Sequence, residues 1–188
     1  GFKTLNAGRM QVSGTEVNVS LIGEFKSFDL QGFVGYTYAK SAALEPNRVM
    51  GKNAFGENIT YQSTSSNFTG NALKYRPVHT AKADIMLNLK KWKFAIGASY
   101  QSQVRNIDLA FISDPISTFV PGVQESIDQE LTAYILFNAR LGYKLSEHWK
   151  TNLIIANITN EEYAIRPADL GAPRSVRLQV TYTLDKSK

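Results

Sequence analysis

The chain has 188 residues, of which 43% are hydrophobic and 20% are charged, and this composition excludes an intrinsically disordered protein. The formal net charge of +5 comes from scattered lysines and arginines, so we expect no basic surface for binding nucleic acid. The absence of cysteine excludes disulfide bonds and thiolate metal sites.

Hydrophobic and polar residues alternate along most of the chain, whereas the helical spacing of three or four residues is nearly absent. The first two alternating segments lie at about residues 12–23 and 28–40, and the short sequence EFKS separates them. A long polar stretch then leads to a third segment at about residues 78–89. We interpret each segment as a β-strand with one apolar and one polar face.

The same alternation continues through the second half of the chain. A lysine pair separates the third segment from a fourth at about residues 92–105. After a second long stretch, alternation resumes at about residues 130–144 and, beyond the short sequence LSEH, at about residues 149–158. A third long stretch, residues 159–172, leads into the last strand, residues 175–184. Its apolar side carries Val176, Leu178, Val180, Tyr182 and Leu184, and its polar side carries Ser175, Arg177, Gln179, Thr181 and Thr183.

The connections between these predicted strands alternate between short and long. In an up-and-down antiparallel sheet, this alternation places every short turn at one end of the sheet and every long loop at the other. Outer-membrane barrels have this asymmetry, and their strands need about 9–11 residues to cross the hydrocarbon layer. The predicted strands have about that length or more, whereas strands of soluble proteins average about 5–6 residues.

Aromatic residues gather at both ends of the predicted strands. Trp92, Tyr143 and Trp149 lie beside short turns, whereas three other tyrosines lie toward the long loops. Two aromatic bands of this kind mark the interfaces of a membrane-spanning barrel. The pattern therefore predicts an all-β protein, a transmembrane antiparallel up-and-down β-barrel segment whose apolar sides face lipid. The alternative is a soluble β-sandwich in which the same residues form a core.

About seven strands are predicted, although closed bacterial barrels have an even number. An open sheet edge in lipid leaves backbone groups unsatisfied, at several kcal/mol each. We therefore expect either one further strand in this chain or, as the favoured interpretation, partner strands on another polypeptide or fragment. If the long loops are extracellular, the first strand begins outside and the last strand ends in the periplasm.

The last part of the chain, NITNEEYAIRPADLGAPRSVRLQVTYTL, resembles the C-terminal signature of TonB-dependent outer-membrane receptors. The signature combines Asn157, Ile158, Asn160 and Tyr163 with Gly171, Pro173 and Arg174 before a final amphipathic strand. Upstream, SGTEVNVSL, GFVGYTYAKS and LKYRPVHTAKADIML resemble other strands of the same family, in the same order. The sequence DKSK after Leu184 departs from the family, which often ends on an aromatic residue.

The resemblance implies a barrel of about 22 strands, so residues 1–188 would be its C-terminal portion, without the plug domain and the earlier strands. It implies that the partners are the remaining strands and plug, outer-membrane lipid, a small-molecule ligand and, through the plug, periplasmic TonB. The location implied is the bacterial outer membrane, and the function implied is import of a scarce solute. The sequence RPADLGAPRSV favours a ferric siderophore or similar iron chelate.

Six inward-facing residues are candidate site residues. Lys82, Asp84 and Arg140 lie on the polar side, where the plug would sit in this family, and we expect them to contact plug residues. Gln101, Arg105 and Tyr134 lie on the same side toward the long loops. Basic and aromatic groups there would bind an anionic ferric chelate by charge-assisted hydrogen bonds.

No arrangement of residues typical of an enzyme or of a metal site stands out. His79 and His148 belong to opposite ends of the predicted sheet, with no nucleophile or metal-ligand spacing around them. The sequence therefore predicts a protein without catalytic activity or cofactor. A passive porin or structural barrel remains the main functional alternative, and a soluble β-sandwich binding module is the other.

Overall fold

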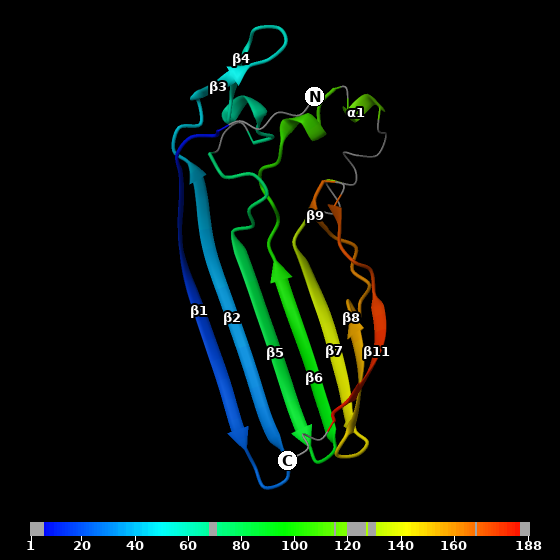
Figure 1. The fold of residues 1–188 in the computed structure, drawn as a ribbon. Coiled ribbons are helices and arrows are strands. Elements are labelled where there is room, and N and C mark those ends of the chain that lie inside the picture. The colour runs from blue at the N-terminus through cyan, green and yellow to red at the C-terminus, as the bar shows by residue number, and fades with distance from the viewer. Residues whose placement is uncertain are drawn as a thin grey trace.

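The computed structural model describes residues 6–67, 71–114, 116–119, 127, 131–167 and 169–184. Its main feature is one antiparallel sheet of seven strands (Figure 1). The strands are β1 (Met10–Glu24), β2 (Asp29–Ala43), β5 (His79–Leu89), β6 (Trp92–Gln101), β7 (Tyr134–Lys144), β8 (Trp149–Ala156) and β11 (Ser175–Tyr182). Within the described residues, no helix is long and apolar enough to cross a membrane.

All seven predicted strands are present, and they pair in chain order as an up-and-down sheet. The fourth predicted strand is shorter than expected, because regular pairing in β6 ends at Gln101 rather than near residue 105. The Ser102 hydroxyl accepts hydrogen bonds from the backbone N–H groups of Val78 and His79, which takes these donors out of the regular ladder. The fifth begins regular pairing at Tyr134, four residues later than predicted.

The short and long connections lie at opposite ends of the sheet, as predicted (Figure 1). Residues 25–28, 90–91 and 145–148 make the short turns. The long connections contain the small elements β3 (Val49–Lys52), β4 (Asn58–Thr60), η1 (Gln62–Thr64), η2 (Leu109–Phe111), α1 (Ile116–Phe119), β9 (Ala164–Arg166) and β10 (Asp169–Leu170).

The pairing register aligns the apolar side of every strand on one face of the sheet, which we call the apolar face. One row across it runs through paired neighbours in six strands: Leu30, Leu87, Phe94, Leu141, Leu153 and Leu178. Because a slip of one residue would move a whole strand to the other face, this agreement confirms the alternation read from the sequence. The opposite, polar face carries most of the charged side chains of the strands.

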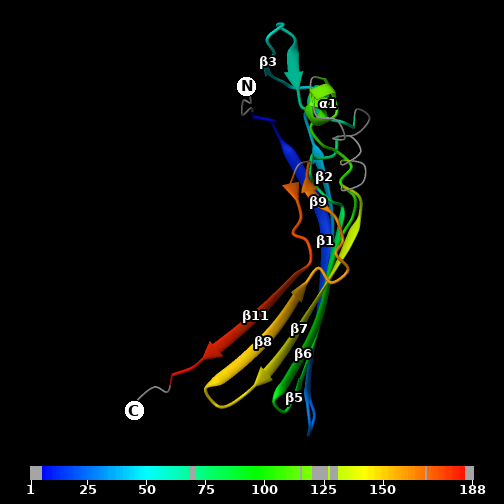
Figure 2. The same cartoon turned by 90° about the vertical axis from the view of Figure 1, so that its right-hand side faces the viewer.

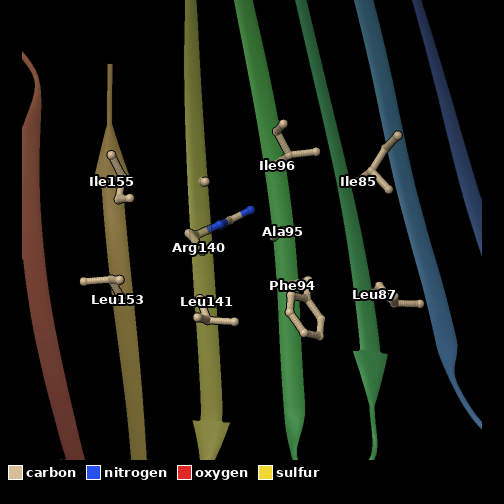
Figure 3. Close-up of a pocket in the computed structure, with 10 residues that line it drawn as sticks. Ile85, Leu87, Phe94, Ala95, Ile96, Arg140, Leu141, Leu153 and Ile155 are labelled. Atoms are coloured by element: carbon tan, nitrogen blue, oxygen red, sulfur yellow. The ribbon is translucent and has the colours of Figure 1, made fainter. Parts of the chain in front are cut away.

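The apolar face has no second layer over it among the described residues. Leu178 is 72% exposed and Val176 is 64% exposed, and Ile96 in the centre of the sheet is 54% exposed. Figure 3 views this face, with the strand order reversed from Figure 1, and shows neighbouring aliphatic side chains lying side by side across β5 to β8. A soluble β-sandwich would bury these residues against another sheet, so the structure fits hydrocarbon as the solvent of this face.

The sheet is curved, and its two edge strands are β1 and β11. Figures 1 and 2 together show that β8 and β11 curl toward the polar face, which makes that face the concave one. A barrel wall has this curvature, with its polar side toward the lumen. Both edges lack a partner strand among the described residues, so closure of the wall requires further strands.

Apart from Ala95 of β6 and Ala43 at the end of β2, the buried apolar residues of the described part of the chain lie in the long loops. One cluster contains Val104, Ile107, Ile127, Leu131 and Ala164 of the second and third long loops, and Tyr75 of the first long loop packs against it. A second cluster packs Tyr61 and Leu73 against Ala43 at the end of β2. The loops therefore form a packed structure of their own at one end of the wall.

Candidate functional site

The middle of the polar face is occupied by an ion pair that crosses β6. Arg140 Nη2 on β7 donates to both carboxylate oxygens of Asp84 on β5, at 2.8 and 2.6 Å. Gly97 of β6 lies between them, and a Cβ atom there would be 2.9 Å from Asp84 Oδ2. A glycine at this position therefore leaves the space through which the two side chains meet.

The three residues predicted to contact a plug all lie on the polar face. Asp84 and Arg140 are bound to each other, but their side chains remain 43% and 50% exposed toward the concave side. Lys82 lies two residues from Asp84, opposite Ser99 of β6 and Gly35 of β2, and forms no ion pair with any described residue. Because the Asp84–Arg140 pair is half exposed, it contributes only about 0–1 kcal/mol to stability.

Two of the three residues predicted to contact a ligand lie together. Gln101 and Tyr134 are cross-strand partners at the long-loop end of β6 and β7. The Tyr134 ring packs against Tyr163 of the last long loop, with ring centroids 4.5 Å apart. Arg105 lies beyond the end of β6, where it lines a hollow together with Arg76. Gln101 and Tyr134 are not among the residues that line this hollow.

A partly buried hydrogen-bond network connects the first two long loops. The Tyr75 hydroxyl donates to Asp108 Oδ2 at 2.7 Å and accepts from the Asp108 backbone N–H at 3.1 Å. Lys74 Nζ, whose side chain is 11% exposed, lies 2.6 Å from Asp108 Oδ1 and also donates to Thr64 Oγ1 at 2.8 Å. Burial, reinforced by the neighbouring Asp108 carboxylate, raises the pKa of Tyr75 above its ordinary value. The phenol therefore stays protonated at neutral pH.

A hollow opens beside this network, where residues of all three long loops meet, and we call it the loop hollow. Its polar lining residues include Ser63, Thr64, Tyr75, Asp108, Arg166 and Asp169. The Arg166 guanidinium lies over the Tyr75 ring, 5.5 Å from its centroid. An aromatic ring and an arginine are groups that orient an oxygen-rich solute.

Asn106 holds the loops around this hollow in place. Its side chain is 1% exposed, and Nδ2 donates to the Ala72 carbonyl at 2.6 Å. Its side-chain oxygen Oδ1 accepts from the Asn67 backbone N–H at 3.3 Å, and the Asn106 backbone carbonyl accepts from the Tyr75 backbone N–H at 2.9 Å. A buried amide with several partners is costly to remove, because its partners would remain unsatisfied.

The residues of the C-terminal signature have structural roles in the last loop. Asn157, which has a φ of 51° and is 4% exposed, donates to the carbonyls of Glu161 and Ala172. Asn160 Oδ1 accepts from the Arg174 backbone N–H at 2.9 Å. A Cβ atom at Gly171 would lie 2.0 Å from the Tyr163 ring. The signature therefore fixes the path of the chain from β8 into β11.

Aromatic side chains pair in two bands on the apolar face. At the short-turn end, Trp92 packs against Tyr143 at 4.5 Å and Trp149 packs against Tyr182 at 4.7 Å between ring centroids. At the long-loop end, His79 Nδ1 lies 2.7 Å from the Tyr36 hydroxyl. His79 is therefore a half-buried member of an aromatic group rather than an exposed histidine at the rim.

The loop hollow was missed by the sequence analysis, which treated its residues as parts of long polar stretches. Lys74, Tyr75 and Asp108 come from two loops more than thirty positions apart. Arg166 was visible only as part of the C-terminal signature. Clusters of three or more side chains that could hold a metal ion are absent among the described residues.

These features define a class of protein: a curved single-layer wall with a lipid-facing side, a polar concave side and packed loops at one end is a segment of an outer-membrane β-barrel. Comparison with protein families gives a more specific assignment. Residues 1–160 match the family described as TonB dependent receptor-like, beta-barrel, and the chain belongs to this family. The protein is therefore located in the bacterial outer membrane.

Solved structures support the fold. The chain resembles the siderophore receptor PiuA from Acinetobacter baumannii, with 20% identity and a TM-score of 0.58. It also resembles the ferric-catecholate import receptor Fiu from Escherichia coli K12, with 17% identity and a TM-score of 0.57. The outer membrane transporter YddB from Escherichia coli matches with 10% identity and a TM-score of 0.58.

Each of these matches covers 92% of this chain but only 22%, 21% and 25% of PiuA, Fiu and YddB, respectively. The chain thus spans about a quarter or less of the length of the solved structures that it resembles. At these identities the resemblance concerns the fold. No curated protein matches the chain.

Proposed function

We propose that this chain forms part of the wall and outer mouth of an active-transport receptor that binds and imports a ferric siderophore or a similar iron chelate. The observation that carries the proposal is the loop hollow, which combines Tyr75, Asp108 and Arg166 at the long-loop end of a barrel wall. In this proposal the end of the wall that carries the long loops faces the outside of the cell. Fiu and PiuA, which the chain resembles in fold, are described as import and siderophore receptors.

The chemistry of the hollow fits such a solute. Ferric siderophores present oxygen atoms and partial or full negative charge, which arginine binds by charge-assisted hydrogen bonds. The hydroxyl groups of Ser63 and Thr64 donate to backbone carbonyls of the first loop, and the Asp108 carboxylate is paired with Lys74 and Tyr75, so Arg166 is the group in the hollow that would bind the solute. Below the loops, Gln101 and Tyr134 extend the same polar path down the wall. The chain performs no bond chemistry in this function.

The remaining strands and the plug complete the receptor in this proposal, and residues 1–188 are its C-terminal portion. The half-exposed Asp84 and Arg140, together with Lys82, face the space that the plug would fill. TonB in the periplasm supplies the energy through the plug. The open edges of β1 and β11 are the places where the other strands pair.

Uptake of radioactive iron tests the proposal in cells that express the complete receptor. We expect accumulation from a catecholate or similar ferric siderophore, dependent on TonB and on the membrane potential. Arg166→Gln should weaken uptake at low substrate concentration by about 10- to 150-fold, since a hydrogen bond to a charged group contributes about 1.5–3 kcal/mol. Lys52→Gln, an exposed loop change of equal charge outside the hollow, should have no effect.

Two outcomes would contradict the proposal. Steady ion conductance of the purified receptor in planar bilayers, together with uptake that does not require TonB, would identify a passive porin. Equal uptake by the Arg166→Gln variant and the unmodified receptor at every concentration would separate the loop hollow from the transported solute.

A further inference from the structure

A second hollow lies where β2 and β5 separate at the long-loop end, and we call it the basic hollow. Ala42 bridges to Ala72, and the Ala39 backbone N–H donates to the Val78 carbonyl at 2.9 Å. Between these two contacts, two residues of β2 stand opposite five residues of the other segment, so the sheet opens locally. The hollow in this gap is lined by Tyr38, Lys40, Arg76, His79 and Arg105, among others.

The basic hollow has a strong excess of positive charge. Lys40, Arg76 and Arg105 line it, all three are exposed, and none of them forms an ion pair with a described residue. No carboxylate is among its lining residues. Three cations around one opening repel one another unless an anion lies between them. The local charge therefore favours a multiply charged anion.

The position of the basic hollow points to the membrane rather than to the lumen alone. Tyr38 and Lys40 continue the apolar face of β2, following Tyr36 at the same parity. His79, paired with Tyr38, packs against its ring with centroids 5.3 Å apart. Aromatic residues of this kind lie at the level of lipid headgroups. Lys40 is thus a cation just beyond the outer boundary of the hydrocarbon layer.

We propose that the basic hollow binds a phosphate group of an outer-leaflet lipid headgroup. The two arginines would bind phosphate oxygens through their planar guanidinium groups, and Lys40 would add a mobile point charge. Clusters of basic residues beside a membrane-spanning segment bind anionic headgroups in this way. The proposal rests on the extracellular orientation of the long loops given under the proposed function, but it does not require that the solute be a siderophore.

Lipid retention by the complete receptor tests this proposal. The receptor is purified from outer membranes in detergent, depleted of lipid and mixed with phosphatidylcholine bicelles that contain bisphosphorylated lipid A, and bound lipid is counted by native mass spectrometry. Each basic residue near an anionic surface contributes about 1 kcal/mol, or about fivefold in affinity. We therefore expect Lys40→Gln to weaken lipid A binding about fivefold and Arg76→Gln with Arg105→Gln to weaken it about 30-fold.

Three controls make the result decisive. Lys52→Gln removes an equally exposed charge of a long loop outside the hollow and should leave lipid A binding unchanged. Dephosphorylated lipid A should bind the unmodified receptor as weakly as lipid A binds the double variant. Unchanged heat-modifiable gel mobility of every variant shows that folding is intact, as expected for exposed side chains.

Several results would overturn the proposal. Equal lipid A binding by the double variant and the unmodified receptor would exclude a headgroup site. Binding of inorganic phosphate alone with the affinity of lipid A would identify a site for free anions. Loss of ferric siderophore binding in the double variant with unchanged lipid A binding would assign Arg105 to the solute path. Failure of siderophore uptake in the unmodified receptor would refute the proposed function and leave the lipid result standing.

Discussion

Replacing Leu178 by arginine tests whether the apolar face contacts hydrocarbon. Leu178 lies on β11, pairs with Leu153 and is 72% exposed in this chain. The next residue, Gln179, pairs with Asn152 on the polar face and is also exposed. Leu178→Arg and Gln179→Arg therefore add similar side chains at the same height of the wall but on opposite faces.

The expected cost follows from the depth of Leu178. It lies four residues from Tyr182, which packs against Trp149 in the aromatic band at the short-turn end. At about 3.4 Å per residue and a tilt of about 45°, Leu178 lies about 10 Å inside that band, near the middle of an apolar belt about 25 Å tall. Arginine near the bilayer midplane costs about 2–4 kcal/mol, whereas a change on a hydrated surface usually costs less than about 0.5 kcal/mol.

The assay compares both variants of the complete receptor in phosphatidylcholine bilayers. Urea unfolding followed by tryptophan fluorescence gives the difference in unfolding free energy, and heat-modifiable gel mobility gives the fraction that folds. Leu178→Arg should lower stability by about 2–4 kcal/mol, and Gln179→Arg should remain close to the unmodified receptor. Equal losses for the two variants, or no loss for Leu178→Arg, would refute the assignment of the two faces.

Three further predictions follow from the loops and the polar face. Gly171→Ala should displace the Tyr163 ring, destabilise the last loop by about 1–3 kcal/mol and speed its cleavage by protease; an unchanged cleavage rate would contradict the contact. Asp84→Asn should change the free energy of unfolding, measured by urea titration, by less than about 1 kcal/mol, because its pair with Arg140 is half exposed; a larger loss would indicate a buried pair. Burial raises the pKa of Tyr75, so loop stability should be complete below about pH 10, the range in which an unfolded tyrosine ionises, and fall as the pH rises further. Hydrogen exchange of the loops between pH 8 and 11 should show a weaker pH dependence in Tyr75→Phe, and identical profiles would show that this phenol does not couple to the loops.

The strands and their two faces were predicted well because period-two alternation is a local property of the chain. Val176, Leu178 and Val180 share one side of β11 whatever they pack against. The order of short and long connections then restricted the sheet to an up-and-down arrangement, and the observed register agrees with it in all seven strands. Even Phe33, which interrupts the alternation, lies on the polar face opposite Asp84, as its position requires.

The candidate sites were harder to predict because they depend on contacts between distant loops. Tyr75 and Asp108 have no periodicity or motif that connects them, although they form the centre of the loop network. Arg105 was grouped with Gln101 and Tyr134 because all three fall on the inward-facing side of their predicted strands, toward the long loops. Regular pairing of β6 ends at Gln101, however, and beyond it Arg105 lines the basic hollow together with Arg76. Odd or even position in the sequence predicts the face on which a side chain lies only as far as the hydrogen-bonded strand continues.

For this protein, local residue patterns were sufficient to establish a two-faced, membrane-spanning sheet, because the same alternation that builds each strand also sorts its side chains between lipid and lumen. The tertiary structure alone decided which charges meet across β6 and which loop residues surround the two hollows. Those contacts join side chains from separate strands and loops, and their positions depend on irregular backbone that no repeating pattern describes.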